Sequence, residues 1–179
     1  MPGLPDVRVL APRAQEQLVS IVHLFGSIGE IAGRLGFAIV VVMLVRQRRL
    51  LRVFAAPALV VVPAVFVYAA TSGVTALKVG SFVATMLVTA QFSFLGNYLP
   101  RLFPTRLRGT GQSVAINVGG RLIGAAAAFI TPQLADVIAG PNSTLRLAYA
   151  MAVVAVVALG TGCAMSFWIP EPKTTSLPA

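Results

Sequence analysis

Glu30, Arg34 and Arg121 each fall near the middle of a long apolar stretch, where ionisable side chains are rare. A charge at the centre of a bilayer costs several kcal/mol, so such a residue normally faces water or a partner inside the protein. Glu30 and Arg34 stand four residues apart, which places them on one helical face and within reach of each other. Two interpretations remain open: an internal ion pair that orients the helix, or a carboxylate that couples to a proton or contacts a solute.

Arg121 has no acidic residue three or four positions away, so its partner must come from another helix, from backbone carbonyls or from a ligand. Asn117 lies one turn earlier on the same predicted face. Glu30 is the one carboxylate at comparable depth. One acid and two arginines leave an excess of one positive charge, which favours an anionic solute.

The stretch before Arg101 carries many uncharged polar residues. Gln91 and Tyr98 share one helical face, and Asn97 lies on the neighbouring face. Such side chains suit the lining of a cavity for a polar solute. They equally suit hydrogen bonding between helices, and both readings stay open.

Glycines on the first apolar stretch point to close helix packing. Gly29 and Gly33 have the GxxxG spacing that lets a second helix approach closely.

The arrangement of residues gives no support for an enzyme. The single histidine, His23, is far from any Ser or Cys arrangement that would supply a nucleophile. No metal-ligand cluster and no glycine-rich phosphate loop occurs. We therefore predict no catalytic residue, no metal and no cofactor.

Composition indicates a membrane protein. The chain is 57% hydrophobic and 11% charged, with a mean hydropathy of +0.86, and soluble domains are rarely so apolar. The net charge of +9 could suggest nucleic-acid binding, but such proteins gather Lys and Arg on one solvated surface, whereas here they are divided among loops. The predicted partner is the lipid bilayer, not nucleic acid.

Five apolar stretches are each long enough to cross a hydrocarbon core, which needs about 20 helical residues. The predicted fold class is an all-α, polytopic transmembrane bundle over residues 17–170, preceded by an irregular external lead-in at 1–16 and followed by a cytoplasmic tail at 171–179. The predicted spans cover about 17–45, 53–71, 77–100, 110–138 and 146–169.

The basic residues predict the orientation of these spans. Eight follow the first, third and fifth spans, whereas four lie at the other ends. The positive-inside rule then places the N-terminus outside and the C-terminus in the cytoplasm. The predicted location is the plasma membrane. The eight are Arg46, Arg48, Arg49, Arg52, Arg101, Arg106, Arg108 and Lys173, and the four are Arg8, Arg13, Lys78 and Arg146.

The segment NYLPRLFPTRLRGTGQSVAINVGGR, from Asn97 to Arg121, resembles the tenth helix, cytoplasmic loop and eleventh helix of major facilitator superfamily transporters. The likeness is greatest to the sugar and organic-acid proton symporters. Arg101 stands where that family has an acidic residue. The matching positions are Pro100, Phe103, Pro104, Thr105, Arg106, Arg108, Gly109, Thr110 and Gly111.

Two further segments are similar to the same family. FWIPEPK, from Phe167, resembles the end of the twelfth helix, and the loop after the first span keeps two family arginines, Arg48 and Arg49. The resemblance implies that Arg48, Arg49, Arg106 and Arg108 form cytoplasmic gating loops. Simple positive-inside anchoring explains these arginines nearly as well.

The resemblance implies helices eight to twelve of a twelve-helix, proton-coupled transporter of a small polar solute, a sugar or an organic acid. The chain would then be part of a larger or truncated transporter, with the missing N-terminal helices as partners. The alternative is a non-transporting scaffold or assembly partner that retains half a transporter fold. The substrate and coupling candidates are Glu30, Arg34, Gln91, Asn97, Tyr98, Asn117 and Arg121.

Overall fold

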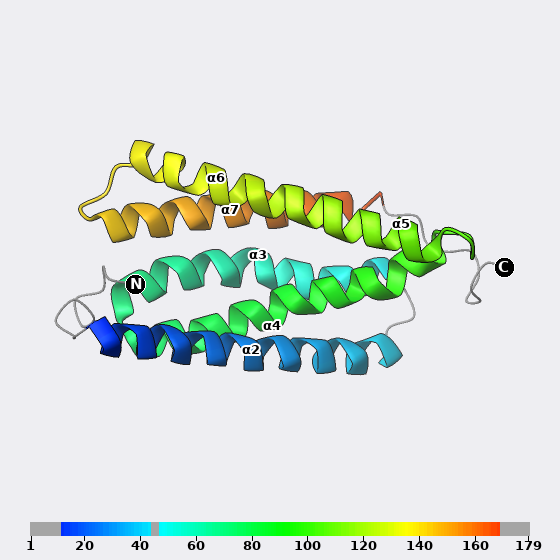
Figure 1. Ribbon diagram of the computed structural model, residues 1–179, viewed down its shortest axis with the longest axis horizontal. Coiled ribbons are helices and arrows are strands. Elements are labelled where there is room, and N and C mark those ends of the chain that lie inside the picture. The colour runs from blue at the N-terminus through cyan, green and yellow to red at the C-terminus, as the bar shows by residue number, and fades with distance from the viewer. Residues whose placement is uncertain (1–11, 44–46, 169–179) are drawn as a thin grey trace.

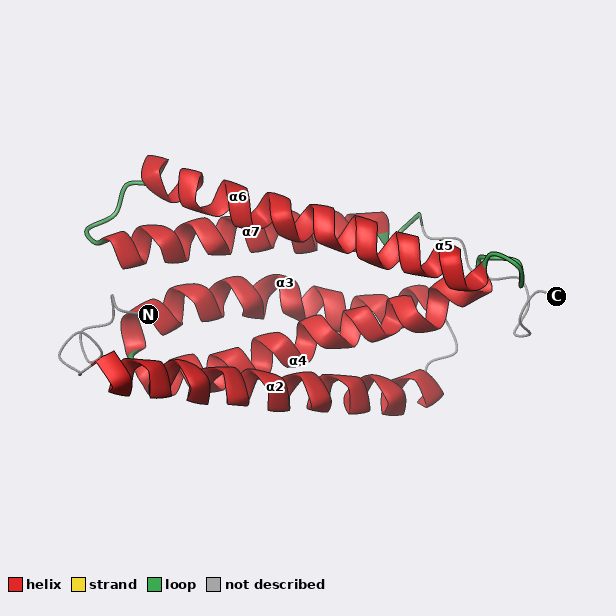
Figure 2. Cartoon of the chain, in the orientation of Figure 1, coloured by secondary structure: helices red, strands yellow, loops and turns green. Residues whose placement is uncertain are grey.

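Helices make up nearly all of the computed structural model, which describes residues 12–43 and 47–168 (Figure 2). No strand occurs within these two ranges. A 3-10 turn at Leu99–Arg101 follows α4, and a π-helical turn at Ala115–Gly119 joins α5 to α6. The helices are α2 (Pro12–Met43), α3 (Gln47–Ser72), α4 (Val74–Tyr98), α5 (Arg108–Val114), α6 (Gly120–Val137) and α7 (Ser143–Met165).

Five helical segments are long and apolar enough to cross a bilayer, which confirms the predicted all-α bundle of five spans. Residues 12–16 are already helical within α2, so they are not part of an irregular lead-in. Residues 1–11 and the predicted tail at 171–179 lie outside the described residues.

The surface of the bundle is apolar. Val42 and Val137 are each 82% exposed and Phe129 is 69% exposed, among many other large apolar side chains. A continuous apolar surface of this kind needs a nonpolar surrounding. Together with the lengths of the helices, it makes the chain an integral membrane protein.

The helices pack in an open row, which Figure 1 shows from the side. α2 packs on α4, α4 on α3, α3 on α7, and α7 on α6. The row therefore ends at α2 on one side and at α6 on the other. In the most apolar 18-residue window of the α5–α6 segment no residue is buried, compared with 28% of the window in α4. Most of the surface of α6 is left without a helical neighbour.

Glycines make the contact between α2 and α4 unusually close. Gly26, Gly29 and Gly33 are all buried, and a Cβ atom on Gly29 or Gly33 would collide with a backbone carbonyl oxygen of α4. Small residues at this spacing let two helix backbones approach. The GxxxG prediction is thus confirmed, and α4 is its partner helix.

A single residue, Gly73, separates α3 from α4. Its φ of 87° lies in the region that glycine adopts without the steric strain of a side chain. The chain can therefore reverse at this point, and α3 and α4 run antiparallel along their length (Figure 1). These two helices form adjoining walls of the cavity described below.

Aromatic side chains fill the core at one end of α2, α3 and α4. Phe37, Phe94 and Tyr98 are 6%, 0% and 4% exposed. The rings of Phe94 and Tyr98 stack with their centroids 5.3 Å apart, and the ring of Phe37 lies 6.0 Å from that of Phe54. We call Phe37, Ala90, Phe94 and Tyr98 the aromatic cluster. Its members belong to α2 and α4, and side chains of α3 pack against them, so the cluster joins three helices at this end.

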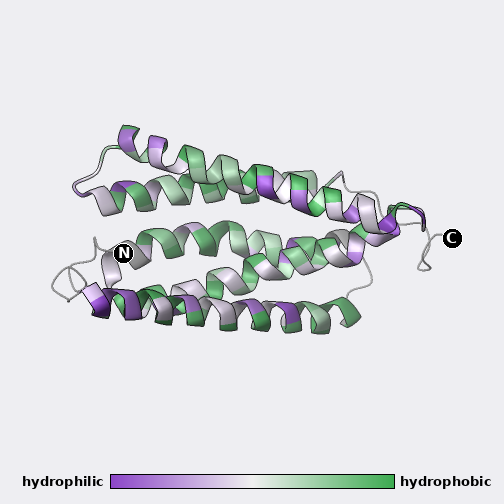
Figure 3. Ribbon diagram, in the orientation of Figure 1, coloured by the Kyte–Doolittle hydropathy of each residue, from purple (hydrophilic) through white to green (hydrophobic). Residues whose placement is uncertain are grey.

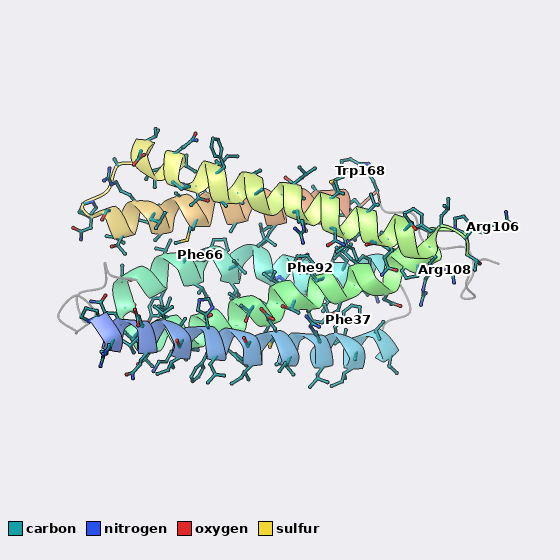
Figure 4. The ribbon with its side chains drawn as sticks, viewed as in Figure 1. Phe37, Phe66, Phe92, Arg106, Arg108 and Trp168 are labelled. Carbon is teal, nitrogen blue, oxygen red and sulfur yellow. The ribbon has the colours of Figure 1, made fainter. Side chains whose placement is uncertain are left out.

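Hydrophilic residues lie toward both ends of the bundle and at a few places along the helices, as the hydropathy colouring shows (Figure 3). The start of α3 and the loop after α4 carry arginines at the end near the aromatic cluster, and Figure 4 labels Arg106 and Arg108 there. Of the described acidic residues, Glu16 and Asp136 lie at the opposite end. We call the end near the aromatic cluster the arginine-rich end. Its described arginine side chains are Arg49, Arg52, Arg101, Arg106 and Arg108.

Candidate functional site: a polar-lined cavity among four helices

A cavity of about 690 Å³ lies among α2, α3, α4 and α7. This volume is typical of sites that bind small molecules. The lining residues come from all four helices: Val22, His23, Glu30, Arg34, Val62, Val65, Phe66, Leu77, Ser81, Ala84, Thr85, Val88, Thr89, Phe92, Thr144, Leu147, Ala148 and Met151.

Both ionisable residues predicted on the first span line this cavity. Glu30 and Arg34 follow one another on the cavity side of α2, and His23 lies two turns earlier. Glu30 is the nineteenth of the 32 residues of α2, close to the middle of that helix. Glu30 and Arg34, which the sequence predicted as candidates for binding a solute or a proton, therefore line the same cavity.

The ion pair between Glu30 and Arg34, one of the two readings left open, is not formed in the described part of the chain. Both side chains are exposed to the open volume beside α2. Both groups consequently remain accessible from the cavity.

Hydroxyl groups on α4 form the polar part of the opposite wall. Ser81, Thr85 and Thr89 recur every four residues, which brings all three to the cavity face. The Thr85 hydroxyl lies 2.8 Å from the carbonyl oxygens of both Gly26 and Ser81, so its proton is used within the protein. Sequence reasoning did not select Ser81 or Thr85, although their spacing of four was a usable signal.

The rest of the lining is mainly apolar. Phe66 on α3 and Phe92 on α4 are the largest side chains of this part, and Figure 4 labels both. Met151 and Leu147 add the wall from α7. An apolar cavity with a few placed polar groups is the usual form of a small-molecule site.

The cavity occupies the half of the bundle away from the arginine-rich end. Its lining runs from Leu77 and Thr144, near the starts of α4 and α7, to Arg34 and Phe92. Beyond these residues lies the aromatic cluster, whose members are between 0% and 6% exposed. The aromatic cluster therefore fills the space among α2, α3 and α4 between the cavity and the arginine-rich end.

Three residues of α4 that were predicted as candidates do not line this cavity. The Gln91 side-chain amide donates to the Leu87 carbonyl oxygen at 3.4 Å, and Asn97 accepts a hydrogen bond from Arg101 at 3.3 Å. Tyr98 is part of the aromatic cluster. The buried face of α4 is the one that carries Ala90, Phe94 and Tyr98. The helical faces on which the polar residues were grouped therefore did not indicate the side of α4 that lines the cavity.

Asn117 and Arg121 do not line the cavity either. The Asn117 amide donates to the carbonyl oxygen of Ser113 at 3.0 Å, and Arg121 is exposed on α6. A π-helical turn adds a residue to one turn of helix and so shifts the faces that follow it. This turn includes Asn117, so the predicted face shared by Asn117 and Arg121 is interrupted.

The charge expected at the site is consequently smaller. Among its lining residues the cavity has one carboxylate, Glu30, and one guanidinium, Arg34. The excess positive charge needed Arg121, which belongs to the far end of the helix row. The argument for an anionic solute therefore loses its basis.

The arginines of the predicted gating loops lie at the arginine-rich end and not at the cavity. Arg49 and Arg106 are exposed and Arg108 is half-buried, whereas the side chain of Arg48 lies outside the described residues. Phe103 packs directly on Gly111, so the loop folds back on the start of the following helix. Their gating role stays a prediction.

A second, apolar cavity of about 500 Å³ lies among α3, α4, α6 and α7. Its lining contains no ionisable side chain, and Thr131 is the one hydroxyl-bearing residue. Within residues 12–43 and 47–168, no three His, Cys, Asp or Glu side chains come together as metal ligands would. The first cavity is thus the candidate site with polar chemistry.

No protein-family model matches this chain, and no curated protein and no solved structure match it.

Proposed function

We propose that this chain is part of a secondary transporter that moves a small polar solute, a sugar or an organic acid, together with a proton across the plasma membrane. The observation that carries the proposal is Glu30, a carboxylate near the middle of a span that lines a cavity of solute size. Ionisable residues at that depth commonly mark solute or proton pathways. The loop resemblance to proton symporters supports the same function.

Each part of the cavity has a place in this mechanism. The solute would bind between the hydroxyls of Ser81 and Thr89 on α4 and the charged groups on α2. The carboxyl group of Glu30 would carry the proton. When the proton leaves, the guanidinium of Arg34, one helical turn away, would stabilise the remaining negative charge. Coupling would arise because the free-energy cost of the change in conformation is lowest when Glu30 is protonated and the solute is bound.

The open row of helices supports membership in a larger transporter. Secondary transporters hold their solute between two halves that rock against each other. The exposed surfaces of α2 and α6 are free to meet further helices. The aromatic cluster would be the closed gate on the arginine-rich side, which we assign to the cytoplasm from the charge count.

The alternative is a non-transporting scaffold or assembly partner. The same open row favours it, because an apolar helix such as α6 with few neighbours offers a surface for another membrane protein. In that case Glu30 and Arg34 would serve only to orient α2. The two functions differ in whether solute moves.

Uptake into proteoliposomes distinguishes them. The chain would be purified together with the further helices of the proposed transporter, reconstituted, and given an inward proton gradient with a panel of radiolabelled sugars and organic acids. We expect accumulation of at least one solute by this native form, and none when the chain carries Glu30→Gln. Glu16→Gln is the matched control, since it removes an exposed carboxylate of α2 outside the cavity. Absence of uptake by folded native protein would favour the scaffold.

A further inference from the structure

The arginine-rich end contains a guanidinium that is fixed in position but makes no ion pair with any described residue. The guanidinium carbon of Arg52 on α3 lies 4.1 Å from the ring centre of Phe167, just beyond the end of α7. Its Nε is buried and has no hydrogen-bond partner among the described residues. Stacking on an aromatic ring holds a guanidinium in place and leaves its edge donors available. Arg52 is therefore poised for an anion.

A second arginine adds to the charge at this point. Arg49 precedes Arg52 by three residues on α3, so the two share one side of the helix, and Arg49 is exposed. No acidic side chain within residues 12–43 and 47–168 neutralises them, because Glu16 and Asp136 lie at the opposite end and Glu30 lines the cavity. Two like charges so close together favour a bound anion.

The aromatic residues beside Arg52 indicate the depth of this pair in the bilayer. Phe167 is 58% exposed and Trp168 is 79% exposed, immediately after the last apolar span. An exposed tryptophan at the end of a span, such as Trp168, lies at the level of the lipid headgroups. The anion most available there is the phosphate of a phospholipid.

We propose that Arg49, Arg52, Phe167 and Trp168 form a binding site for the headgroup of an anionic phospholipid. The two guanidinium groups donate hydrogen bonds to the phosphate oxygens, an arrangement that arginine makes in bidentate form. The aromatic rings pack against the glycerol and upper acyl region. Basic pockets at the ends of membrane helices bind anionic headgroups by these same contacts. This site does not depend on the proposed transport function.

Trp168 is the single tryptophan of the chain, so its fluorescence reports on this site alone. The full chain would be placed in bicelles in which a small fraction of the lipid is brominated phosphatidylglycerol or, separately, brominated phosphatidylcholine. Bromine quenches tryptophan only at close range. We expect phosphatidylglycerol to reach half-maximal quenching at a mole fraction roughly ten-fold or more below that of phosphatidylcholine.

The double variant Arg49→Gln/Arg52→Gln should lose this preference, while Arg13→Gln/Lys78→Gln, which removes two charges at the opposite end, should keep it. Arg49→Gln alone changes an exposed side chain and should weaken the preference about five-fold, so the test does not depend on the folding of the double variant. Equal quenching by both lipids, or an unchanged preference in Arg49→Gln, would overturn the proposal. Loss of the preference on adding millimolar inorganic phosphate would also overturn it, because the site would then bind free phosphate.

Discussion

At the scale of single residues, Glu30 carries the most chemistry. It is the described carboxylate that combines a position near the middle of a span with a place on a solute-sized cavity. Arg34 lines the same cavity, and no ion pair joins the two within the described part of the chain. This arrangement keeps both charges available to a third group, which is a requirement for coupling a proton to a solute.

The glycines behind Glu30 should be intolerant of any side chain. In Gly33→Ala the new Cβ would meet the Met86 carbonyl oxygen, and overpacking of this kind destabilises by roughly 1–3 kcal/mol. Gly36→Ala is the matched control, because a Cβ there has nothing within 4 Å. Thermal unfolding in detergent should show a lower midpoint for Gly33→Ala only. Equal midpoints would mean that α2 and α4 are further apart than described.

Alanine substitutions at two phenylalanines of α4 should differ in their effect on stability. Phe94 is 0% exposed in the aromatic cluster, whereas Phe92 is 54% exposed beside the cavity. Phe94→Ala leaves a void in the core and should cost about 3–5 kcal/mol of stability. Phe92→Ala should leave the unfolding midpoint nearly unchanged. A comparable loss in both variants would contradict the placement of the closed end.

The residues that sequence reasoning found and missed have a physical pattern. Glu30 and Arg34 were predicted because a charge inside an apolar span has few alternatives to a cavity. Ser81 and Thr85 were missed because hydroxyls in membrane helices commonly bond to their own backbone and carry no distinctive signal. Tyr98 was misplaced because an aromatic ring with a hydroxyl fits a buried core and a cavity wall equally well.

At the scale of elements, α6 differs most from its neighbours. It packs mainly on α7, and its most apolar window has no buried residue. The π-helical turn at Ala115–Gly119 lies immediately before it. Such turns often occur at functional positions in helices. The segment therefore combines weak packing with an irregular backbone.

Hydrogen exchange in detergent should reveal this difference. Segments with few buried contacts open at lower free energy than well-packed ones. Peptides from Ala115–Gly119 and the following turns of α6 should take up deuterium before peptides from the middle of α4, which is the most buried of the spans. Equal protection of both helices in the isolated chain would show that α6 has contacts beyond α7.

The spans were predictable to within a few residues because the thickness of a bilayer sets the length of an apolar helix. The helical structure of residues 12–16 was not predictable from hydropathy, since these residues are mostly polar. The π-helical turn was also missed because no residue type specifies it. The order of the helices in the row depends on contacts between distant segments, such as Gly33 with Met86.

At the scale of the whole molecule, charge divides the bundle into two unlike ends. The arginine-rich end lies beside the aromatic cluster, and the cavity approaches the other end. The positive-inside rule assigns the first to the cytoplasm. The cavity would then be reached from outside the cell.

Labelling of single cysteines tests this orientation. In a Cys163→Ser background, a membrane-impermeant maleimide should label Asn142→Cys on intact cells, because Asn142 is exposed at the end away from the arginines. Leu107→Cys, which replaces a side chain that is 57% exposed near Arg108, should react only after the membrane is broken. The reverse pattern would place the arginine-rich end outside.

Proton movement driven by the solute is the most direct test of coupling through Glu30. Proteoliposomes containing an internal pH dye would receive the solute identified by the uptake panel, with no imposed proton gradient. We expect the interior to acidify with the native chain and with Glu16→Gln, and to stay unchanged with Glu30→Gln. Acidification that persists in Glu30→Gln, or solute entry through the native chain without any proton movement, would contradict the account.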